Sequence, residues 1–124
     1  MDHVAVARAL FAAFAAGDGG TIRSLCSADF RARQNNGQSM DLDSVLKFAS
    51  AVLRVVADFR YEDPVRSSTA SGFVEEHRVR GTLPDGSALD LAVCVVADVR
   101  DGKVTDLREY FDGVAAAGLV SALS

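Results

Sequence analysis

Features that mark disulfide-linked, metal-bound or membrane proteins are scarce in this sequence. It contains only two cysteines, Cys26 and Cys94, which lie in apolar stretches without Cys-x-x-Cys or Cys/His spacing. We therefore expect buried free thiols in a reducing compartment. No apolar run approaches the roughly 20 residues that span a bilayer, and the amino terminus shows no basic and then apolar leader. The expectation is a cytoplasmic protein without membrane attachment.

Basic residues are too few and too scattered for a nucleic-acid surface. The chain has 13 Lys and Arg against 17 Asp and Glu, a formal net charge of −4. Phosphate binding requires clustered positive charge, and no aromatic residues interleave with the arginines to stack on bases. The spacing of residues also shows no metal site, phosphate-binding glycine loop or Ser–His–Asp arrangement. We expect no nucleic acid, no metal and no cofactor.

The size and composition that remain are those of an ordinary globular domain. A length of 124 residues lies near the commonest domain size, and 49% hydrophobic with 24% charged residues excludes disorder. A chain of this length buries roughly two-thirds of its unfolded surface, which is enough for one core without disulfides or a structural metal ion. The absence of linkers and repeats predicts a single domain over residues 1–124.

Helical periodicity dominates the first half of the chain. Val6, Leu10 and Phe14 recur at i, i+4 and i+8 within residues 4–16, which predicts a first helix. A glycine-rich break follows, after which Asp18 can cap a short second helix through residues 22–26. Either Asp41 or Asp43 can cap a third helix, whose apolar residues keep the 3.6 period to residue 56. These patterns predict three amino-terminal helices.

The second half alternates with a period of two. We expect a short strand over residues 30–34 and then four longer strands over residues 59–66, 72–83, 87–100 and 103–111. Pro84-Asp85-Gly86 and Asp101-Gly102 are turn sequences that connect the last three as hairpins. The Ala-rich tail 113–123 can close as a helix. Segregation of helices from an antiparallel meander predicts an α+β fold.

The strand from residue 88 is apolar on both faces. Leu91, Val93 and Val95 point to one face, and Cys94 and Val96 to the other. A strand of this kind is buried on both sides. One face meets the helices, and the other needs a cover, so we expect a homodimer through the outer face of the sheet.

Charged residues on two strands suggest a polar group inside an apolar pocket. Glu76 and Arg78 share a face of one strand, and Glu109 lies on the last strand. If these three share the face of Leu91, Val93 and Phe111, two carboxylates flank one guanidinium in a pocket for a small apolar molecule. An ion-pair network that only stabilises the fold is the alternative. By the same parity His77 is exposed or interfacial, and Tyr61 packs with its hydroxyl near solvent.

The order of elements and several motifs resemble the nuclear transport factor 2-like superfamily. The resemblance is carried by Gly17-Asp18, Ser27-Ala28-Asp29-Phe30, Leu83-Pro84-Asp85-Gly86, Asp101-Gly102-Lys103-Val104 and Arg108-Glu109-Tyr110-Phe111-Asp112. The last three are similar to the carboxy-terminal half of the limonene epoxide hydrolases, and the SnoaL-like polyketide cyclases share the two turns. This resemblance implies a cone-like curved sheet wrapped around the three amino-terminal helices.

The limonene epoxide hydrolases use an Asp-Arg-Asp group to activate water and protonate the epoxide. The resemblance places Glu109 at the ending acid, and Glu76 and Arg78 at the two strand positions with their order exchanged. Gln34 takes the place of an Asn that positions the water, and Ala32 that of a Tyr. Asp90 lies near the acid of the polyketide cyclases, but its parity sets it away from the pocket.

Three functions follow from these expectations. The first is a cofactor-free enzyme on a small apolar substrate, with catalytic Glu76, Arg78 and Glu109, and with substrate bound by Gln34, Leu91, Val93 and Phe111. Epoxide hydrolysis is its most specific form, and a SnoaL-like cyclase or isomerase is an alternative. The second is a non-catalytic pocket for a small hydrophobic ligand, anchored by Arg78. The third is a dimerisation module with an incidental cavity.

Overall fold

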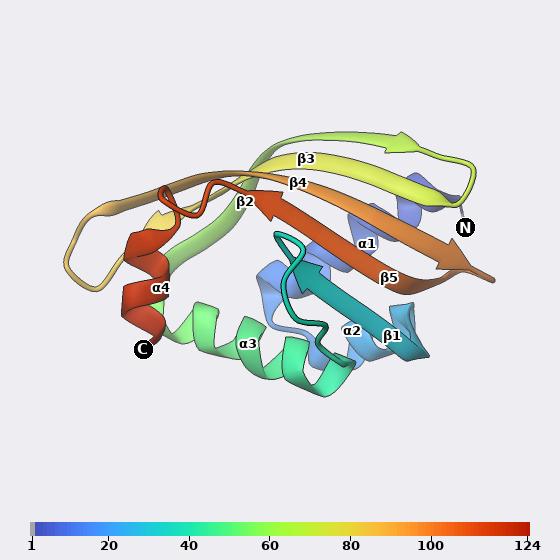
Figure 1. The fold of residues 1–124 in the computed structure, drawn as a ribbon, viewed down its shortest axis with the longest axis horizontal. Coiled ribbons are helices and arrows are strands. Elements are labelled where there is room, and N and C mark those ends of the chain that lie inside the picture. The colour runs from blue at the N-terminus through green and yellow to red at the C-terminus, as the bar shows by residue number, and fades with distance from the viewer. Residues whose placement is uncertain (1) are drawn as a thin grey trace.

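A computed structural model describes residues 2–124, so Met1 lies outside the described range. Within that range the chain forms four helices and five strands (Figure 1). In chain order they are α1 (His3–Ala16), α2 (Gly19–Leu25), β1 (Cys26–Gln34), α3 (Leu42–Val55), β2 (Ala57–Ser68), β3 (Gly72–Thr82), β4 (Ala88–Arg100), β5 (Lys103–Phe111) and α4 (Ala117–Leu123). Every expected helix and strand is present, with ends that differ by a few residues.

Aspartate caps define where the first three helices begin. The Asp2, Asp18 and Asp41 side chains accept hydrogen bonds from backbone N–H groups at 2.7, 3.1 and 2.9 Å. Each cap satisfies a donor that the first helical turn leaves unpaired. Of the two residues expected to cap α3, Asp41 is the cap. Gly17 ends α1 at φ 67°, a left-handed conformation that favours glycine.

The strands form one mixed sheet in the order β1-β5-β4-β3-β2. The expected antiparallel meander of β2 to β5 is confirmed, and β1 adds a parallel edge by pairing with β5. The sheet is curved and does not close on itself (Figure 1). Helices α1 and α3 lie on its concave side, and α4 lies at one end against α3. This curvature leaves space between the sheet and the helices.

The core lies between α1 and the concave face of the sheet. Val6, Leu10 and Phe11 of α1 are buried, as are the inward residues of β4. Those residues alternate along the strand and are Leu89, Leu91, Val93, Val95 and Ala97. No helix among residues 2–124 is both long and apolar enough to cross a membrane.

The outer face of the sheet mixes small apolar residues with ion pairs. Ala92 is exposed there, and Cys94 and Val96 are half-buried. Arg78 Nε donates to Asp90 Oδ1 at 2.8 Å beside this strip. The apolar strip along β4 therefore exists as expected, and the homodimer through it stays a prediction.

We predict that the chain is a dimer at micromolar concentration and that Val96→Glu yields monomers, because the new carboxylate would be buried unpaired in the interface. Light scattering coupled to size-exclusion chromatography measures both masses. Val114→Glu is the matched control, since Val114 is 86% exposed and lies away from the sheet. A monomeric wild type would contradict the prediction.

Candidate functional site

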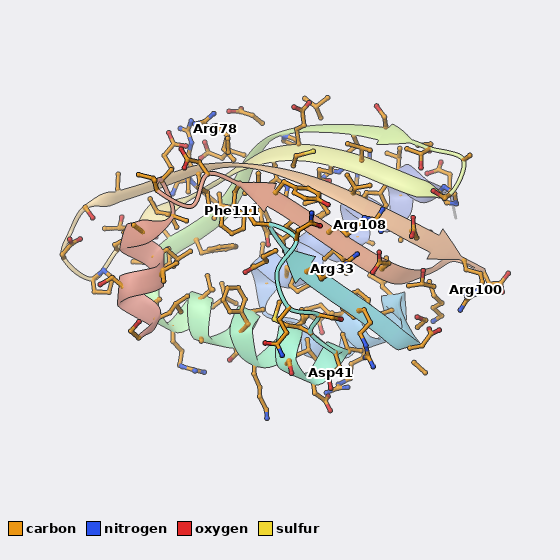
Figure 2. All side chains as sticks on the ribbon, in the orientation of Figure 1. Arg33, Asp41, Arg78, Arg100, Arg108 and Phe111 are labelled. Atoms are coloured by element: carbon orange, nitrogen blue, oxygen red, sulfur yellow. The ribbon has the colours of Figure 1, made fainter. Side chains whose placement is uncertain are left out.

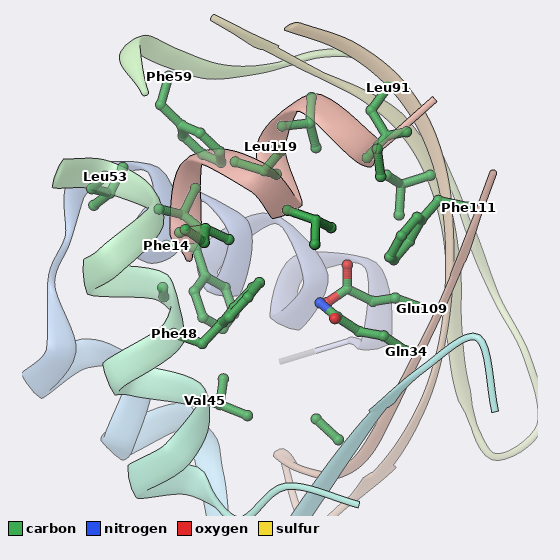
Figure 3. Close-up of a pocket in the computed structure, with 18 of the residues that line it drawn as sticks. Phe14, Gln34, Val45, Phe48, Leu53, Phe59, Leu91, Glu109, Phe111 and Leu119 are labelled. Carbon is green, nitrogen blue, oxygen red and sulfur yellow. The ribbon is translucent and has the colours of Figure 1, made fainter. Parts of the chain in front are cut away.

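A cavity of about 390 Å³ lies between the concave face of the sheet and helices α1, α3 and α4 (Figure 3). Its volume falls within the range of small-molecule sites. Aromatic side chains form much of the wall, namely Phe11, Phe14, Phe48, Phe59, Tyr61 and Phe111. The polar side chains among the lining residues are Gln34, Tyr61, Glu109 and Ser124. The cavity is thus apolar with few polar groups.

Two helices present apolar faces to this cavity because of their periodicity. On α3 the lining residues recur at helical spacing, as Val45, Phe48, Ala49, Val52 and Leu53. The opposite face of α3 carries Lys47 and Arg54, so the amphipathic helix fixes which side faces inward. On α4, Leu119, Val120 and Leu123 also contribute to the wall. The carboxy-terminal helix therefore completes the cavity.

Five of the predicted site residues lie together in the cavity. Gln34, Leu91, Val93, Glu109 and Phe111 all line it. Gln34 and Glu109 are register partners in the parallel pairing of β1 with β5. Their side chains point to the same region of the cavity (Figure 3). An amide and a carboxyl group thus converge within an apolar enclosure.

The expectation that Glu76 and Arg78 share the face of Glu109 is wrong. Glu76 is exposed, and Arg78 projects from the outer side of the sheet, away from the helices (Figure 2). Arg78 pairs there with Asp90, which confirms that Asp90 faces away from the cavity. The alternation of side chains along β3 does not by itself say which face of the strand points into the cavity. The pairing register shows that Glu75, and not Glu76, lies on the face of Glu109. Glu75 and Glu109 both pair with Val95 of β4, and paired residues share a face.

Sequence reasoning missed a buried polar group behind the cavity wall. Glu75 is fully buried and His77 is 3% exposed, so the expectation of an exposed His77 is also wrong. Arg66 Nε donates to Glu75 Oε1, and His77 Nδ1 lies 2.5 Å from Glu75 Oε2. A signal was available in the hairpin: pairing symmetric about Asp85 places Glu75 opposite Val95 and His77 opposite Val93.

Aromatic rings separate His77 from the cavity. The imidazole packs edge-on against Phe11, with 4.9 Å between ring centroids, and at a tilt against Tyr61, with 4.6 Å between ring centroids. Both rings line the cavity. Tyr61 packs against Phe11 and Phe59, as expected of a packing residue, and it also lies in the cavity wall.

Burial perturbs the titration of the two ionisable groups in the wall. It raises the pKa of the Glu109 carboxyl above its ordinary value, and the positive charge of a protonated His77 partly opposes this. Burial also raises the pKa of the Tyr61 hydroxyl, helped by the negative charges of Glu109 and Glu75. Glu109 can consequently keep a proton at a pH where an exposed glutamate has lost it. That property suits a group that both takes and returns protons.

A second, polar hollow adjoins the cavity at Gln34 and Met40. Gln34 and Met40 line both spaces, while Arg31, Gln38 and Ser44 face only the hollow. The cavity and the surface therefore meet at Gln34. Among residues 2–124, no group of three or more His, Cys, Asp or Glu side chains is placed to hold a metal ion.

We predict that Glu109→Gln stabilises the protein in a pH-dependent way. The folded-state pKa of Glu109 is raised, so the unfolded chain releases this proton first and wild-type stability falls as pH rises above about 4.5. Glutamine keeps the shape and removes that penalty. Urea unfolding at pH 4, 5.5 and 7 should show a stability gain that grows with pH. Glu76→Gln, on the exposed face, is the matched control, and an equal gain at all three pH values would contradict the prediction.

Solved structures of low sequence identity share this architecture. A proposed polyketide cyclase from Pseudomonas putida superposes with a TM-score of 0.81 at 21% identity, covering 100% of this chain and 99% of that one. A limonene epoxide hydrolase-like epoxide hydrolase from Mycobacterium tuberculosis gives 0.73 at 17% identity, with coverages of 96% and 92%. A protein of Catenulispora acidiphila with a ketosteroid isomerase-like fold gives 0.79 at 12% identity, with coverages of 91% and 90%.

These likenesses establish the nuclear transport factor 2-like fold, and at such identities they establish the fold alone. No curated protein matches the sequence significantly. The family is nevertheless defined by sequence, because residues 7–107 match the SnoaL-like domain, which is most of the chain. The chain belongs to the SnoaL-like domain family.

Proposed function

We propose that the cavity is the active site of a cofactor-free enzyme that moves a proton on a small, largely apolar carbonyl compound, as an isomerase or cyclase does. One observation carries the proposal: Glu109 is the one charged side chain among the described residues that line an otherwise apolar enclosure. Its raised pKa brings its proton affinity toward the working pH of the cell, where general acid–base catalysis is most effective.

In this reaction the Glu109 carboxylate takes a proton from the carbon beside a carbonyl group. The electron pair of the broken C–H bond forms a C=C bond, and the carbonyl oxygen gains the negative charge. The amide N–H groups of Gln34 and the hydroxyl of Tyr61, both in the cavity wall, are the donors available to that oxygen. The protonated Glu109 then returns the proton to another carbon. Alternatively, the enolate carbon attacks a second carbonyl and closes a ring, and the oxygen of that carbonyl takes the proton from Glu109.

Proton exchange tests this proposal without knowledge of the natural substrate. Small cyclic ketones and diketones are incubated with the protein in D₂O, and loss of the α-proton signal is followed by NMR. We expect wild type to accelerate exchange for some members of the panel, and Glu109→Gln to lose about 100-fold or more. Glu76→Gln removes the same charge from the exposed face and should keep full activity.

The outcomes separate the proposed enzyme from a binding protein. Equal exchange rates for wild type and Glu109→Gln would contradict acid–base catalysis by Glu109. Thermal stabilisation by panel members without exchange would instead support the non-catalytic pocket. In that case Arg78→Ala should leave the stabilisation unchanged, because Arg78 lies on the outer face.

Epoxide hydrolysis is the second candidate, and the convergence of Gln34 and Glu109 favours it. An amide and a carboxylate at one point of the cavity (Figure 3) can hold a water molecule between them. Glu109 would take a proton from this water as its oxygen attacks an epoxide carbon. The C–O bond of the ring breaks, and the leaving oxygen takes a proton from the Tyr61 hydroxyl. Glu109 then gives up the proton that it took from water, which restores the Tyr61 hydroxyl and the Glu109 carboxylate. Glu76 and Arg78 have no part in this version.

We predict for this candidate that cyclic epoxides are converted to diols carrying one ¹⁸O atom in ¹⁸O-enriched water. Mass spectrometry detects the label. Gln34→Leu should lower the rate by about 10-fold or more, because a misplaced nucleophile is costly, and Gln38→Leu at the surface hollow is the control. Diol formation that is unaffected by either Gln34→Leu or Glu109→Gln would place hydrolysis outside the cavity.

A further inference from the structure

Three charged or ionisable side chains lie buried behind the cavity and are not used by the proposed reaction. Arg66 comes from β2, and Glu75 and His77 come from β3. Their side chains are 18%, 0% and 1% exposed. Burying such groups is costly, and an apolar set of similar volume is often as stable. The position of this cluster beside a cavity therefore calls for a role other than stability.

The hydrogen bonds fix the arrangement of the cluster. Arg66 stands opposite Glu75 in the register of β2 with β3, and its Nε donates to Glu75 Oε1. The other oxygen, Oε2, faces His77 Nδ1 at 2.5 Å. A carboxylate paired with a guanidinium stays ionised and can only accept hydrogen bonds. His77 Nδ1 must therefore carry a proton, which leaves Nε2 as the nitrogen that can bind or release a second proton.

Few groups stand close enough to respond to that charge. His77 contacts Glu75 on its own strand, Tyr61 on β2 and Phe11 on α1, and Arg66 of β2 holds the far side of Glu75. Glu109 of β5 faces the same side of the sheet, because Glu75 and Glu109 both pair with Val95 of β4. The charges of Arg66 and Glu75 cancel within their pair. Phe11 is apolar, and Tyr61 is a neutral phenol. Among residues 2–124, the acid on this inner face that lacks a cationic partner of its own is Glu109, in the cavity.

We propose that Arg66, Glu75 and His77 form a positioning relay in which Glu75, held by Arg66, keeps the proton of His77 on Nδ1 so that the imidazole can take up a positive charge across the cavity wall from Glu109. His77 is not one of the residues that line the cavity, and it packs against Phe11 and Tyr61, which do line it. It therefore acts on Glu109 through the electric field, and not as a proton donor to substrate.

The charge on His77 determines the direction in which the pKa of Glu109 moves. A cationic His77 favours the carboxylate form of Glu109, so it extends the pH range in which Glu109 is ready to accept a proton. Without His77, burial alone acts on Glu109, and the carboxyl keeps its proton to higher pH. The significance of the relay for catalysis rests on the proposed role of Glu109, but the relay itself is measurable without any substrate.

The first test is the tautomer of His77 in the wild-type protein, read from ¹⁵N chemical shifts. The chain has two histidines, so His3→Gln assigns the signals. We expect His77, when neutral, to carry its proton on Nδ1, whereas free imidazole side chains in water favour Nε2. A neutral His77 protonated on Nε2 would overturn the proposal, and this measurement needs no variant of the relay to fold.

The second test is the titration of Glu109, followed by the ¹³C signal of its carboxyl carbon. The chain has four glutamates, and Glu109→Gln identifies the signal. In His77→Gln the midpoint should move to higher pH. In His3→Gln it should stay at the wild-type value, because the His3 imidazole is held at the start of α1, where its Nδ1 forms a hydrogen bond with the backbone oxygen of Gly72. An unchanged midpoint in a folded His77→Gln would overturn the relay.

These results are independent of the exchange assay. If Glu109→Gln keeps full exchange activity, the proposed function fails while the relay still stands or falls on the two NMR measurements. If the enzyme is confirmed and the relay is correct, the acidic limb of the pH–rate profile moves to higher pH in His77→Gln but not in His3→Gln.

Discussion

The register of β4 between β3 and β5 determines which charges enter this protein and which stay outside. A shift of one residue exchanges the two faces of a strand completely. With Leu89, Leu91, Val93 and Val95 of β4 facing the helices, the pairing brings Glu75 and His77 inward on β3 and Glu109 inward on β5. The same pairing puts Glu76, Arg78 and Arg80 on the outer face. The hydrophobic pattern of one strand thus selects the chemistry of the cavity.

The two sides of β3 handle charge in different ways. On the outer face Arg78 and Arg80 pair with Asp90 and Glu62 near water, where such pairs contribute little to stability. On the inner face a single carboxylate, Glu75, receives both Arg66 and His77 and is fully removed from water. Removing one partner there leaves an uncompensated buried charge, which costs about 3–5 kcal/mol. The buried group of Arg66, Glu75 and His77 is therefore held in a fixed geometry, whereas the outer ion pairs are not.

Local signals in the sequence predicted the architecture well but the charged part of the site only in part. Helical period, aspartate caps and the two hairpin turns each act over a few residues, and they gave the order of elements and the curved α+β fold. The alternation along β4 and β5, taken together with the family resemblance, placed Leu91, Val93, Glu109 and Phe111 correctly, and the resemblance alone placed Gln34. Glu76 and Arg78 were not placed correctly, because every residue from 75 to 78 is polar, so β3 has no apolar face of its own there to orient it. The choice between its two faces depends on pairing with β4, a contact between strands that only the symmetry of the hairpin about Asp85 encodes.

A cavity of this kind is a compromise between stability and reactivity. Filling it with larger side chains would add packing, and replacing Glu109 by a neutral residue would remove the cost of burying an ionisable group. The sequence does neither: α3 and α4 line the space without closing it, and Glu109 lies in its wall without a salt-bridge partner in the described part of the chain. Burial raises the pKa of Glu109, and the charge of a protonated His77 opposes this rise. His77 packs behind the rings of Phe11 and Tyr61, so it acts on Glu109 through the electric field. Within residues 2–124 no cation pairs with this carboxyl and no side chain forms a hydrogen bond with it, so the carboxyl is free to exchange its proton with a molecule in the cavity.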